Sequence, residues 1–524
     1  MTVARLEITV EELSIAWSRV KADHLNVRFV DHPHVLRWIE SDLDAWLVEI
    51  RDELAAGYQP RSSHMCWALK PGGLLRPGTV LEVEDELVYN MLLGRLLPQL
   101  RRQLADLQGN PDLSYILADS ADDTAWIRTG FRLWTQWRKR SIERLDQGAS
   151  YMLVADITGF YDNIDIRKLM SHMRAACGAR DELKLLGNCL SKWARPRDRG
   201  IPQGYSASHL LAKLFLEPVD RALMNDGYVH LRYVDDYRVF LESKRQGRAA
   251  IARLTALLHR TGLSLQSAKT KVMGKSQAKA TIDGVALVIG DIADTLAAEI
   301  GEAQGLGDDY LPSWEVDEIL ESREGPPPEI LERAFQEHFA AAGDDRFNKT
   351  VFRYLLTRLG KARSNVAVEY CLDAIRTRPE ETAPILRYFA GVHLSDAQST
   401  ALVAFMGSPD AQYDYQLYQF VRWLYVENLQ SDPAAALCRD WAFDQNRSTW
   451  LRSYCVAYLG EHGDASDLDN LEESLSEAHT AVEKADIISA IRKMEVSRRN
   501  ATYGRAEAED GLAARAVRFC KSAT

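Results

Sequence analysis

The chain has 524 residues, 46% of them hydrophobic and 27% charged, which excludes a disordered or collagen-like protein. At about 100–200 residues per domain, this length predicts about three structural units. No apolar run reaches the ~18–20 residues that cross a bilayer, and the N-terminal stretch is no signal peptide, so we expect a soluble, cytoplasmic protein without a membrane partner. The seven cysteines lack CxxC spacing and indicate neither a zinc site nor a disulfide framework.

The charge is unevenly distributed along the chain. The net charge is −11, of which residues 311–524 carry −10, whereas residues 167–280 carry +13. A basic belt inside an acidic chain can bind a polyanion locally while the rest keeps the protein in solution. A chance cluster of solvated charges explains the same counts equally well.

The first 150 residues predict helices joined by loops. Residues 1–64 are helical and acidic and carry no further prediction. A glycine-rich turn follows at Pro71–Gly73, then a helical stretch at Asp85–Leu107 and a basic aromatic stretch at Trp137–Arg144. From Tyr151 the pattern changes, because YMLVAD predicts a short apolar strand that ends in a carboxylate.

The next segment predicts an α+β unit. Its apolar spacing indicates helices over Ile166–Ala176, Ala207–Leu223 and Gly247–Arg260. The β-rich runs VHLRYV and YRVFLE are separated only by Asp235-Asp236, which is the pattern of a hairpin, and a further β-prone run lies near Thr281–Ile289. This order of elements describes an antiparallel sheet whose helices cover one face.

Beyond a Gly/Asp/Pro-rich passage, almost the whole sequence predicts helices. Segments such as Trp450–Gly460 and Ala481–Met494 resemble the paired helices of a HEAT-type α-solenoid, although their period is irregular. The expected segments are an N-terminal helical part (1–64), a second part (65–150), the α+β unit (151–300), a linker (301–328) and a helical-repeat domain (329–524).

Three motifs carry the chemistry, and the first is VADITGFYDNID (Val154–Asp165). It places Asp156 at the end of a buried strand, with Phe160 and Tyr161 shortly after. A carboxylate there can bind Mg²⁺, a hard cation that takes oxygen ligands and keeps substrate phosphates in its shell. A strand-terminal aspartate that caps the next turn is the commoner explanation for such a residue alone.

The second motif is LRYVDDYRVF (Leu231–Phe240), with two adjacent acids at the tip of an apolar hairpin. Like charges so close repel each other, and a bound divalent cation relieves that repulsion. The alternative is a solvated Asp-Asp turn.

The third motif is RGIPQGYSASHLLAKLFLEPVD (Arg199–Asp220). Its Pro-Gln-Gly turn precedes an apolar helix, so that Gln203 and backbone amides can face a base or a phosphate, and Gly204 permits close backbone approach. An ordinary helix start is the better explanation for this motif in isolation. Together, the three motifs predict carboxylates on neighbouring strands beside a nucleotide-facing turn, which suits two-metal phosphoryl transfer.

With these three motifs in this order, the chain resembles a reverse transcriptase over roughly residues 65–290. Its carboxylates match that family's palm motifs, its PQG turn matches, and LLRPGTVLEVEDELVYNMLL (Leu74–Leu93) and GLSLQSAKTKV (Gly262–Val272) resemble the fingers motif and the next palm motif. The implied fold is a right-hand polymerase with α+β fingers (65–150) and palm (151–300), followed by the all-α HEAT-like repeat domain. The implied catalytic residues are Asp156, Asp235 and Asp236.

The resemblance also implies ligands and contacts. Two Mg²⁺ ions, for which Mn²⁺ could substitute, would be held by Asp156, Ile157, Asp235 and Asp236. Tyr161 is the aromatic gate that excludes a ribose 2′-hydroxyl, Arg76 meets the incoming triphosphate, and Lys269 is a phosphate contact or general acid. The implied dNTP-binding residues are Arg76, Tyr161, Gln203, Gly204 and Lys269.

Departures from the family pattern narrow the subtype. Lys213 follows Ala212 where intron-type enzymes usually place Asn, Leu81 stands where many relatives carry Pro, and no clear primer-grip motif follows Lys269. The acidic helical tail is similar to bacterial defence-associated reverse transcriptases of the abortive-infection and "unknown group" lineages. That resemblance implies antiphage DNA synthesis, either untemplated and protein-primed or templated by an associated non-coding RNA, in a homo-oligomer that binds dNTPs and its DNA product.

Two other functions are kept open, a retron-type or group II intron-type templated enzyme and an inactive palm that serves as a scaffold. Within the tail, the tyrosines of YDYQLYQFVRWLY (Tyr413–Tyr425) are candidate primers, although helix packing explains them better. Trp137 and its basic neighbours could clamp a template strand by stacking and charge, and a solvated helix face explains these residues almost equally well. The candidate nucleic-acid contacts are Arg138, Lys139, Arg140, Arg197 and Arg199.

Overall fold

The computed structural model describes residues 5–26, 29–118, 126–128, 131–194, 198–282, 328–340, 347–509 and 511–522. The chain forms two compact units. The first comprises Met1–Val30, Leu43–Cys66 and Pro77–Asp283, and the second comprises Asp31–Asp42, Trp67–Arg76 and Gly284–Thr524. Apart from Pro328, the expected linker lies outside the described residues.

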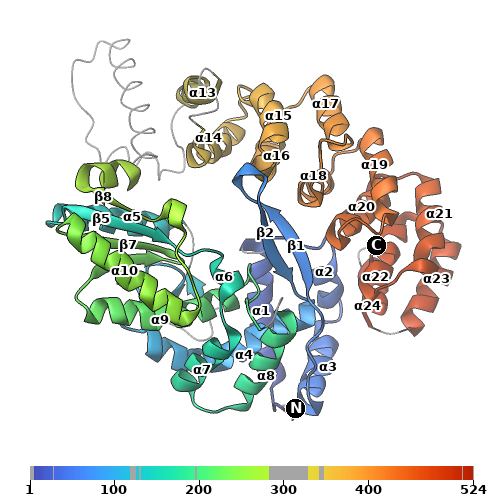
Figure 1. Ribbon diagram of the computed structural model, residues 1–524. Coiled ribbons are helices and arrows are strands. Elements are labelled where there is room, and N and C mark those ends of the chain that lie inside the picture. The colour runs from blue at the N-terminus through green and yellow to red at the C-terminus, as the bar shows by residue number, and fades with distance from the viewer. Residues whose placement is uncertain are drawn as a thin grey trace. The chain divides into compact units, whose positions relative to one another are not determined.

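A four-stranded antiparallel sheet organises the first unit (Figure 1). Its strand order is β6 (Val229–Tyr233), β7 (Asp236–Leu241), β5 (Tyr151–Asp156) and β8 (Lys271–Gly274). β6 and β7 form the expected hairpin around the two-residue turn at Val234 and Asp235. The prediction of an α+β unit with an antiparallel sheet is therefore confirmed.

Helices cover both faces of this sheet, rather than one. Met152, Leu231, Phe240 and Met273 share one face, where they pack against α5 (Phe131–Asp146) and the helical residues 275–282. α9 (Ser206–Asn225) and α10 (Lys244–Thr261) pack against the strands from the opposite face. Helical spacing favours a helix over the expected strand near Thr281–Ile289, because Ala278 and Ile282, four residues apart, both reach the core. That prediction is wrong for Thr281 and Ile282, and its other residues lie outside the described part.

The rest of the first unit is largely helical, as predicted. α4 is buried along most of its length, and its apolar residues follow the expected helical spacing. Two small two-stranded sheets are also present, β3 (Ile116–Leu117) with β4 (Ile127–Arg128), and β1 (His64–Leu69) with β2 (Leu75–Val80), of which the residues Trp67–Arg76 belong to the second unit. The remaining helices are α1 (Val10–Asn26), α3 (Leu43–Ala56), α4 (Val83–Leu104), α6 (Phe160–Asn163), α7 (Ile166–Cys177) and α8 (Asp181–Trp193).

The second unit is a succession of helices (Figure 1). Alternate helices α14, α16, α18, α20, α22 and α24 each contact the next in that series. Such neighbour-to-neighbour stacking is typical of helical-repeat proteins. The helices after the gap are α13 (Pro328–Phe335), α14 (Lys349–Lys361), α15 (Val368–Thr377), α16 (Thr382–Gly391), α17 (Asp396–Met406), α18 (Asp414–Val426), α19 (Asp432–Phe443), α20 (Thr449–His462), α21 (Ala465–Glu473), α22 (Ala481–Ala490), α23 (Val496–Ala508) and α24 (Gly511–Ser522).

Residues 31–42 belong to this helical unit, which differs from the expected single N-terminal segment 1–64. The reason is a polar network. The Asp31 carboxylate accepts hydrogen bonds from the hydroxyls of Tyr418 (2.5 Å) and Tyr454 (2.9 Å) and from Arg422. α2 (Val35–Glu40) also contacts α24. None of the helices that the structure describes combines the length and the apolar character that a bilayer span requires.

Candidate active site

The three predicted carboxylates meet at one edge of the palm sheet. Asp156 ends β5 and lies directly opposite Asp236, the first residue of β7, while Asp235 occupies the adjoining turn. Residues directly opposite on antiparallel strands have Cβ atoms about 4.5–5.5 Å apart on the same face. Burial, followed by the charges of Asp235 and Asp156, raises the pKa of Asp236 to about 7. The repulsion predicted from the sequence is therefore present.

The turn that carries Asp235 has an unusual backbone. Val234 adopts a φ of +59°, in a region where a β-branched residue is strained. A positive φ at the first position of a two-residue hairpin turn matches the right-handed twist of the flanking strands. The strain therefore accompanies a tight turn that places two acids in succession at the sheet edge.

A lysine and a short loop approach Asp156. The Nζ of Lys269 lies 3.2 Å from Asp156 Oδ1, and its side chain is 64% exposed. The backbone of Gln266 donates to Asp156 O, and Thr158 N donates to Ser264 O. Because successive backbone groups alternate in direction along a strand, the carbonyl of the intervening Ile157 points the other way, towards β7. The Ile157 side chain is buried, so this carbonyl is its only group that could contact an ion.

The three carboxylates and the Ile157 carbonyl offer only oxygen atoms, which are the ligands that a hard divalent cation prefers. Their charge also fits, because a cation would relieve the repulsion that raises the pKa of Asp236. Within the described ranges, however, no three His, Cys, Asp or Glu side chains stand together as a ready metal site. The ammonium of Lys269 instead contacts Asp156. Binding of an ion therefore requires the carboxylates to turn towards it.

Tyr161, the residue predicted to exclude a 2′-hydroxyl, is buried and hydrogen-bonded to another buried side chain. Tyr161 lies on α6 and is 6% exposed, and its hydroxyl forms a 2.6 Å hydrogen bond with His209 Nδ1. The His209 ring stacks on Tyr115 with centroids 3.7 Å apart and 9° between the planes. Neither His209 nor Tyr115 was predicted from the sequence, because an isolated histidine on an apolar helix carries no signal for function.

The predicted PQG turn precedes α9. Gly204 has a φ of +94°, which only glycine adopts readily, and Gln203 is half-buried beside it. The Tyr205 hydroxyl accepts from Leu81 N (2.9 Å) and donates to Thr79 O (3.2 Å). Tyr205 therefore links the turn to the end of β2 and to the residue that follows it.

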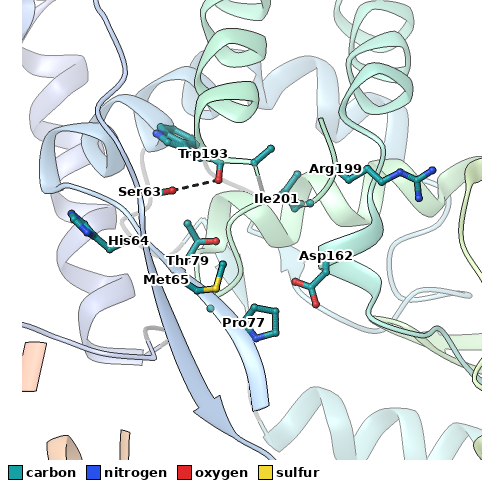
Figure 2. A pocket seen from close by; sticks show the side chains of 12 residues that line it. Ser63, His64, Met65, Pro77, Thr79, Asp162, Trp193, Arg199 and Ile201 are labelled. Atoms are coloured by element: carbon teal, nitrogen blue, oxygen red, sulfur yellow. Dashed lines mark hydrogen bonds between the residues drawn. The ribbon is translucent and has the colours of Figure 1, made fainter. Parts of the chain in front are cut away.

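A pocket opens beside α6, the start of β1, the second half of β2 and the segment before the PQG turn. Figure 2 shows its lining, with His64 and Arg199 on opposite sides of the view and Asp162 between them. A hydrogen bond from the Ser63 hydroxyl to the Trp193 carbonyl (3.4 Å) borders it. The lining residues are Ser63, His64, Met65, Pro77, Gly78, Thr79, Asp162, Trp193, Ala194, Arg199, Gly200 and Ile201.

A buried ion network lies under the opposite face of the sheet and was not predicted. Arg232 contacts Asp220 and Asp112, at 2.6 and 2.7 Å, and Lys213 contacts Asp112 at 2.6 Å. All four side chains are at most 2% exposed. Lys213, the departure from the intron-type pattern, therefore belongs to the core. Its sequence position gave no such signal, because lysine is rarely buried unless it is paired.

The predicted nucleic-acid residues are dispersed. Lys139 on α5 is exposed, Arg138 is half-buried, and Arg140 donates to the carbonyl of Gly109. Arg199 is exposed at the pocket, and Arg197 lies outside the described residues.

Stacking of a template base on Trp137, which the sequence suggested, is wrong. Trp137 is 5% exposed, and the Arg238 guanidinium lies 3.4 Å from its ring centroid. The aromatic residue is therefore part of the core that covers the sheet.

Arg76 lies on β2 in the segment Trp67–Arg76, which belongs to the second unit. It is half-buried. Its predicted contact with a triphosphate stays a prediction.

Residues 69–282 match the family described as "Reverse transcriptase (RNA-dependent DNA polymerase)". This part of the chain is similar to reverse transcriptase domains. The match confirms the predicted enzyme class, an RNA-directed DNA polymerase, and it covers the antiparallel sheet with all three carboxylates. A comparison with curated proteins gave no match.

Solved structures of low similarity include two telomerases and one Cas6-RT-Cas1–Cas2 complex. The chain covers 52% of a C-terminally truncated apo telomerase from Candida tropicalis, with 40% of its own length, 13% identity and a TM-score of 0.28. It covers 40% of a chain in a partial Cas6-RT-Cas1–Cas2 complex, with 47% of its own length, 16% identity and a TM-score of 0.26. It covers 75% of a telomerase from Candida albicans in complex with a fragment of telomeric RNA, with 91% of its own length, 12% identity and a TM-score of 0.29. The chain thus spans about half of the length of the truncated telomerase and less than half of the length of the chain in the Cas6-RT-Cas1–Cas2 complex.

Proposed function

We propose that this protein is a DNA polymerase that transfers nucleotides from dNTPs, with Asp156, Asp235 and Asp236 as its catalytic carboxylates. The observation that carries the proposal is the register of Asp156 opposite Asp236, beside Asp235, within a reverse transcriptase domain. Asp156, Asp235, Asp236 and the carbonyl of Ile157 would hold two Mg²⁺ ions, or Mn²⁺ in their place. When bound, these ions activate an attacking hydroxyl and stabilise the pyrophosphate that leaves.

The chain's own residues would bind and orient the dNTP. Lys269 already contacts a carboxylate at 3.2 Å, and its exposed ammonium can move to a phosphate when a cation replaces it. Gln203 and the open backbone at Gly204 would face the nucleotide, and Arg76 would meet its triphosphate. Tyr161 would exclude a 2′-hydroxyl, since α6 places its buried ring five residues after Asp156.

The nucleic-acid partner we propose is an associated non-coding RNA, with the DNA product beside it. Exposed Arg199 at the pocket and exposed Lys139 on α5 could contact phosphates. The sheet face that bears the carboxylates is covered by α5 and residues 275–282, where the expected primer-grip motif was missing. Because these helices occupy the face on which a long primer–template duplex would lie, we favour synthesis that is untemplated or that starts from an unusual primer.

The biological setting we propose is antiphage defence, as in the abortive-infection and "unknown group" lineages. The acidic succession of stacked helices supports this setting over a group II intron-type enzyme, because a domain that grips a structured RNA should be basic. We further propose that the helices are HEAT-like and that the protein forms homo-oligomers. Of the tyrosines that could prime synthesis, Tyr418 is unsuited, since it is 2% exposed and its hydroxyl bonds to Asp31.

A scaffold with an inactive palm is the second candidate. It is favoured by one observation, the Lys269–Asp156 contact in a described region without a ready metal site. Calorimetric titration with Mg²⁺ and dNTP separates the two, because a scaffold should bind neither.

The experiment that tests the proposed function is incorporation of each labelled dNTP by the purified protein with Mg²⁺. The first reactions contain no primer or template, and the products run on a denaturing gel with and without protease. Asp235→Asn and Asp236→Asn should abolish the product. Asp226→Asn is the matched control, because that aspartate pairs with Arg253 at the surface.

Each outcome of this assay has a definite meaning. Label that stays with protein until digestion supports protein priming, and product that requires added RNA and a primer supports templated synthesis. Incorporation that survives in both active-site variants contradicts the assignment of the carboxylates.

A further inference from the structure

We propose that His209 is a positioning residue that sets the choice between deoxyribonucleotides and ribonucleotides, because it fixes the ring of Tyr161. This inference rests on the proposed function, in which Tyr161 excludes the 2′-hydroxyl. It gives a role to a residue of the third motif to which the sequence assigned none, as the support of the Tyr161 ring.

The contact between the two side chains is direct and directional. The Tyr161 hydroxyl lies 2.6 Å from His209 Nδ1, and the rings meet edge to face, with centroids 5.6 Å apart and 77° between their planes. Tyr161 sits on α6, which spans only Phe160–Asn163, so its own helix is too short to hold it rigidly. The bond to α9 therefore ties the gate to a long buried helix.

His209 is itself fixed on its other side. Its ring stacks on Tyr115 at 3.7 Å, and it is 5% exposed. Burial, helped by the charge of Lys213, lowers the pKa of His209 to about 3, so the imidazole is neutral near pH 7. A neutral imidazole has one nitrogen that accepts, and the buried phenol keeps its proton to donate.

The support continues into the ion network. Lys213 donates to Ser114 O at 2.6 Å, and the Ser114 hydroxyl donates to Asp112 at 2.7 Å. These bonds hold the backbone immediately before Tyr115. Tyr115 has a φ of +44°, a conformation that needs such restraint in a non-glycine residue.

Discrimination by a ring depends on where the ring stands. A ribonucleotide differs from a deoxyribonucleotide by one oxygen atom, so a ring that can move by about the size of that atom no longer excludes it. Removing one buried hydrogen bond should relax discrimination by about 3–10-fold, the range that such a bond contributes. Removing the ring itself should relax discrimination further.

The test measures, for each variant, the ratio of kcat/KM for a dNTP to kcat/KM for the matching rNTP. A ratio is independent of the fraction of folded enzyme. Tyr161→Phe and His209→Phe delete the same bond and should lower the ratio equally, by about 3–10-fold. The double variant should add nothing, because the two changes act through one contact. His209→Gln, which keeps a hydrogen-bonding group, should recover part of the ratio.

Two controls set the upper and lower limits of the expected change in the ratio. His172→Phe alters a half-buried histidine that contacts Phe215 in the same unit, and it should leave the ratio unchanged. Tyr161→Ala should give the lowest ratio of all.

The failures are distinguishable. Wild-type protein that incorporates no dNTP overturns the proposed function, and the inference with it. An unchanged ratio in Tyr161→Ala leaves the polymerase in place but overturns the inference, because the gate is then elsewhere. A low ratio in Tyr161→Ala with wild-type ratios in Tyr161→Phe and His209→Phe overturns the role of His209 alone. Should His209→Phe not fold, Tyr161→Phe tests the same bond.

Discussion

Arg232 donates a hydrogen bond from Nη1 to the carbonyl oxygen of Val234 at 2.9 Å. The same guanidinium contacts Asp220 and Asp112, both buried. A φ of the kind seen at Val234 costs about 1–3 kcal/mol and persists where its surroundings enforce it. One arginine therefore joins the buried ion network on the far face of the sheet to the turn that presents Asp235.

Arg232→Met should destabilise the first unit strongly. It leaves Asp112 and Asp220 buried without their main counter-charge, a change that costs about 3–5 kcal/mol of unfolding free energy. Urea denaturation measures the loss. Arg253→Met, which removes an exposed ion pair with Asp226, is the control and should cost below about 1 kcal/mol. Equal decreases in the free energy of unfolding of both variants would show that the buried network contributes no more than a surface ion pair.

Lys213→Asn, which introduces the residue typical of intron-type enzymes, should also destabilise the protein. Asparagine is too short to keep both the contact with Asp112 and the bond to Ser114 O. We expect a loss of about 2–3 kcal/mol, less than for Arg232, because Arg232 still balances Asp112. Thermal or urea unfolding checks this, with Lys184→Asn at an exposed pair as control. A neutral result would mean that asparagine is accommodated without loss.

The stability that Asp236 contributes to the metal-free protein should fall as the pH rises from about 4 to 7. The pKa of Asp236 is raised to about 7 in the folded protein, above the ordinary value, so the folded state holds a proton that the unfolded state has lost. Stability from this group is complete at low pH and is lost as the pH passes through 7, with a slope of up to about 1.4 kcal/mol per pH unit. Urea midpoints in EDTA measure the trend.

Asp236→Asn should remove that contribution, so its stability relative to the wild type should increase as the pH rises from about 4 to 7 and should exceed that of the wild type at pH 8 without metal. Millimolar Mg²⁺ should raise the wild-type midpoint at pH 8 and leave the variant almost unchanged. Parallel pH profiles for the two proteins would refute this assignment of the titrating group.

Gly460→Ala should destabilise the helical unit. A Cβ at Gly460 would lie 2.5 Å from Ala490 Cα, so α20 and α22 would have to separate. Such overpacking typically costs about 1–3 kcal/mol. Gly504→Ala on α23 is the matched control, since a Cβ there meets nothing within 4 Å, and it should stabilise by about 0.5–1 kcal/mol. The unfolding midpoints of the two variants should therefore shift in opposite directions.

The parts of the fold that short-range patterns determine could be predicted. β5 was expected because an apolar run ends at Asp156, and the β6–β7 hairpin because only two residues separate two β-rich runs. The prediction that the carboxylates lie on neighbouring strands is confirmed, with Asp156 directly opposite Asp236. The candidate carboxylates could be found for the same reason, since each lies inside a local motif.

Features that depend on distant residues could not be predicted. Asp112 joins the network through Lys213 and Arg232, each about a hundred residues away or more, and nothing near Asp112 in sequence indicates a partner. Trp137 was expected to bind nucleic acid because its basic neighbours suggested it, yet apolar burial decided its place. Thr281 and Ile282, predicted to lie in a strand, lie in a helix, because Ile282 packs against the core one helical turn after Ala278.

The Asp31 network also determines when the protein can finish folding during its synthesis. Asp31 and Tyr418 are 387 residues apart, so a ribosome that adds about 5–20 residues per second makes the second roughly 20–80 s after the first. Through that interval, residues 31–42 have emerged without the helices that will bury Trp38. The helical unit therefore closes last, around a segment made first, and when it is produced without residues 31–42 it should recover its stability only when that peptide is added in trans.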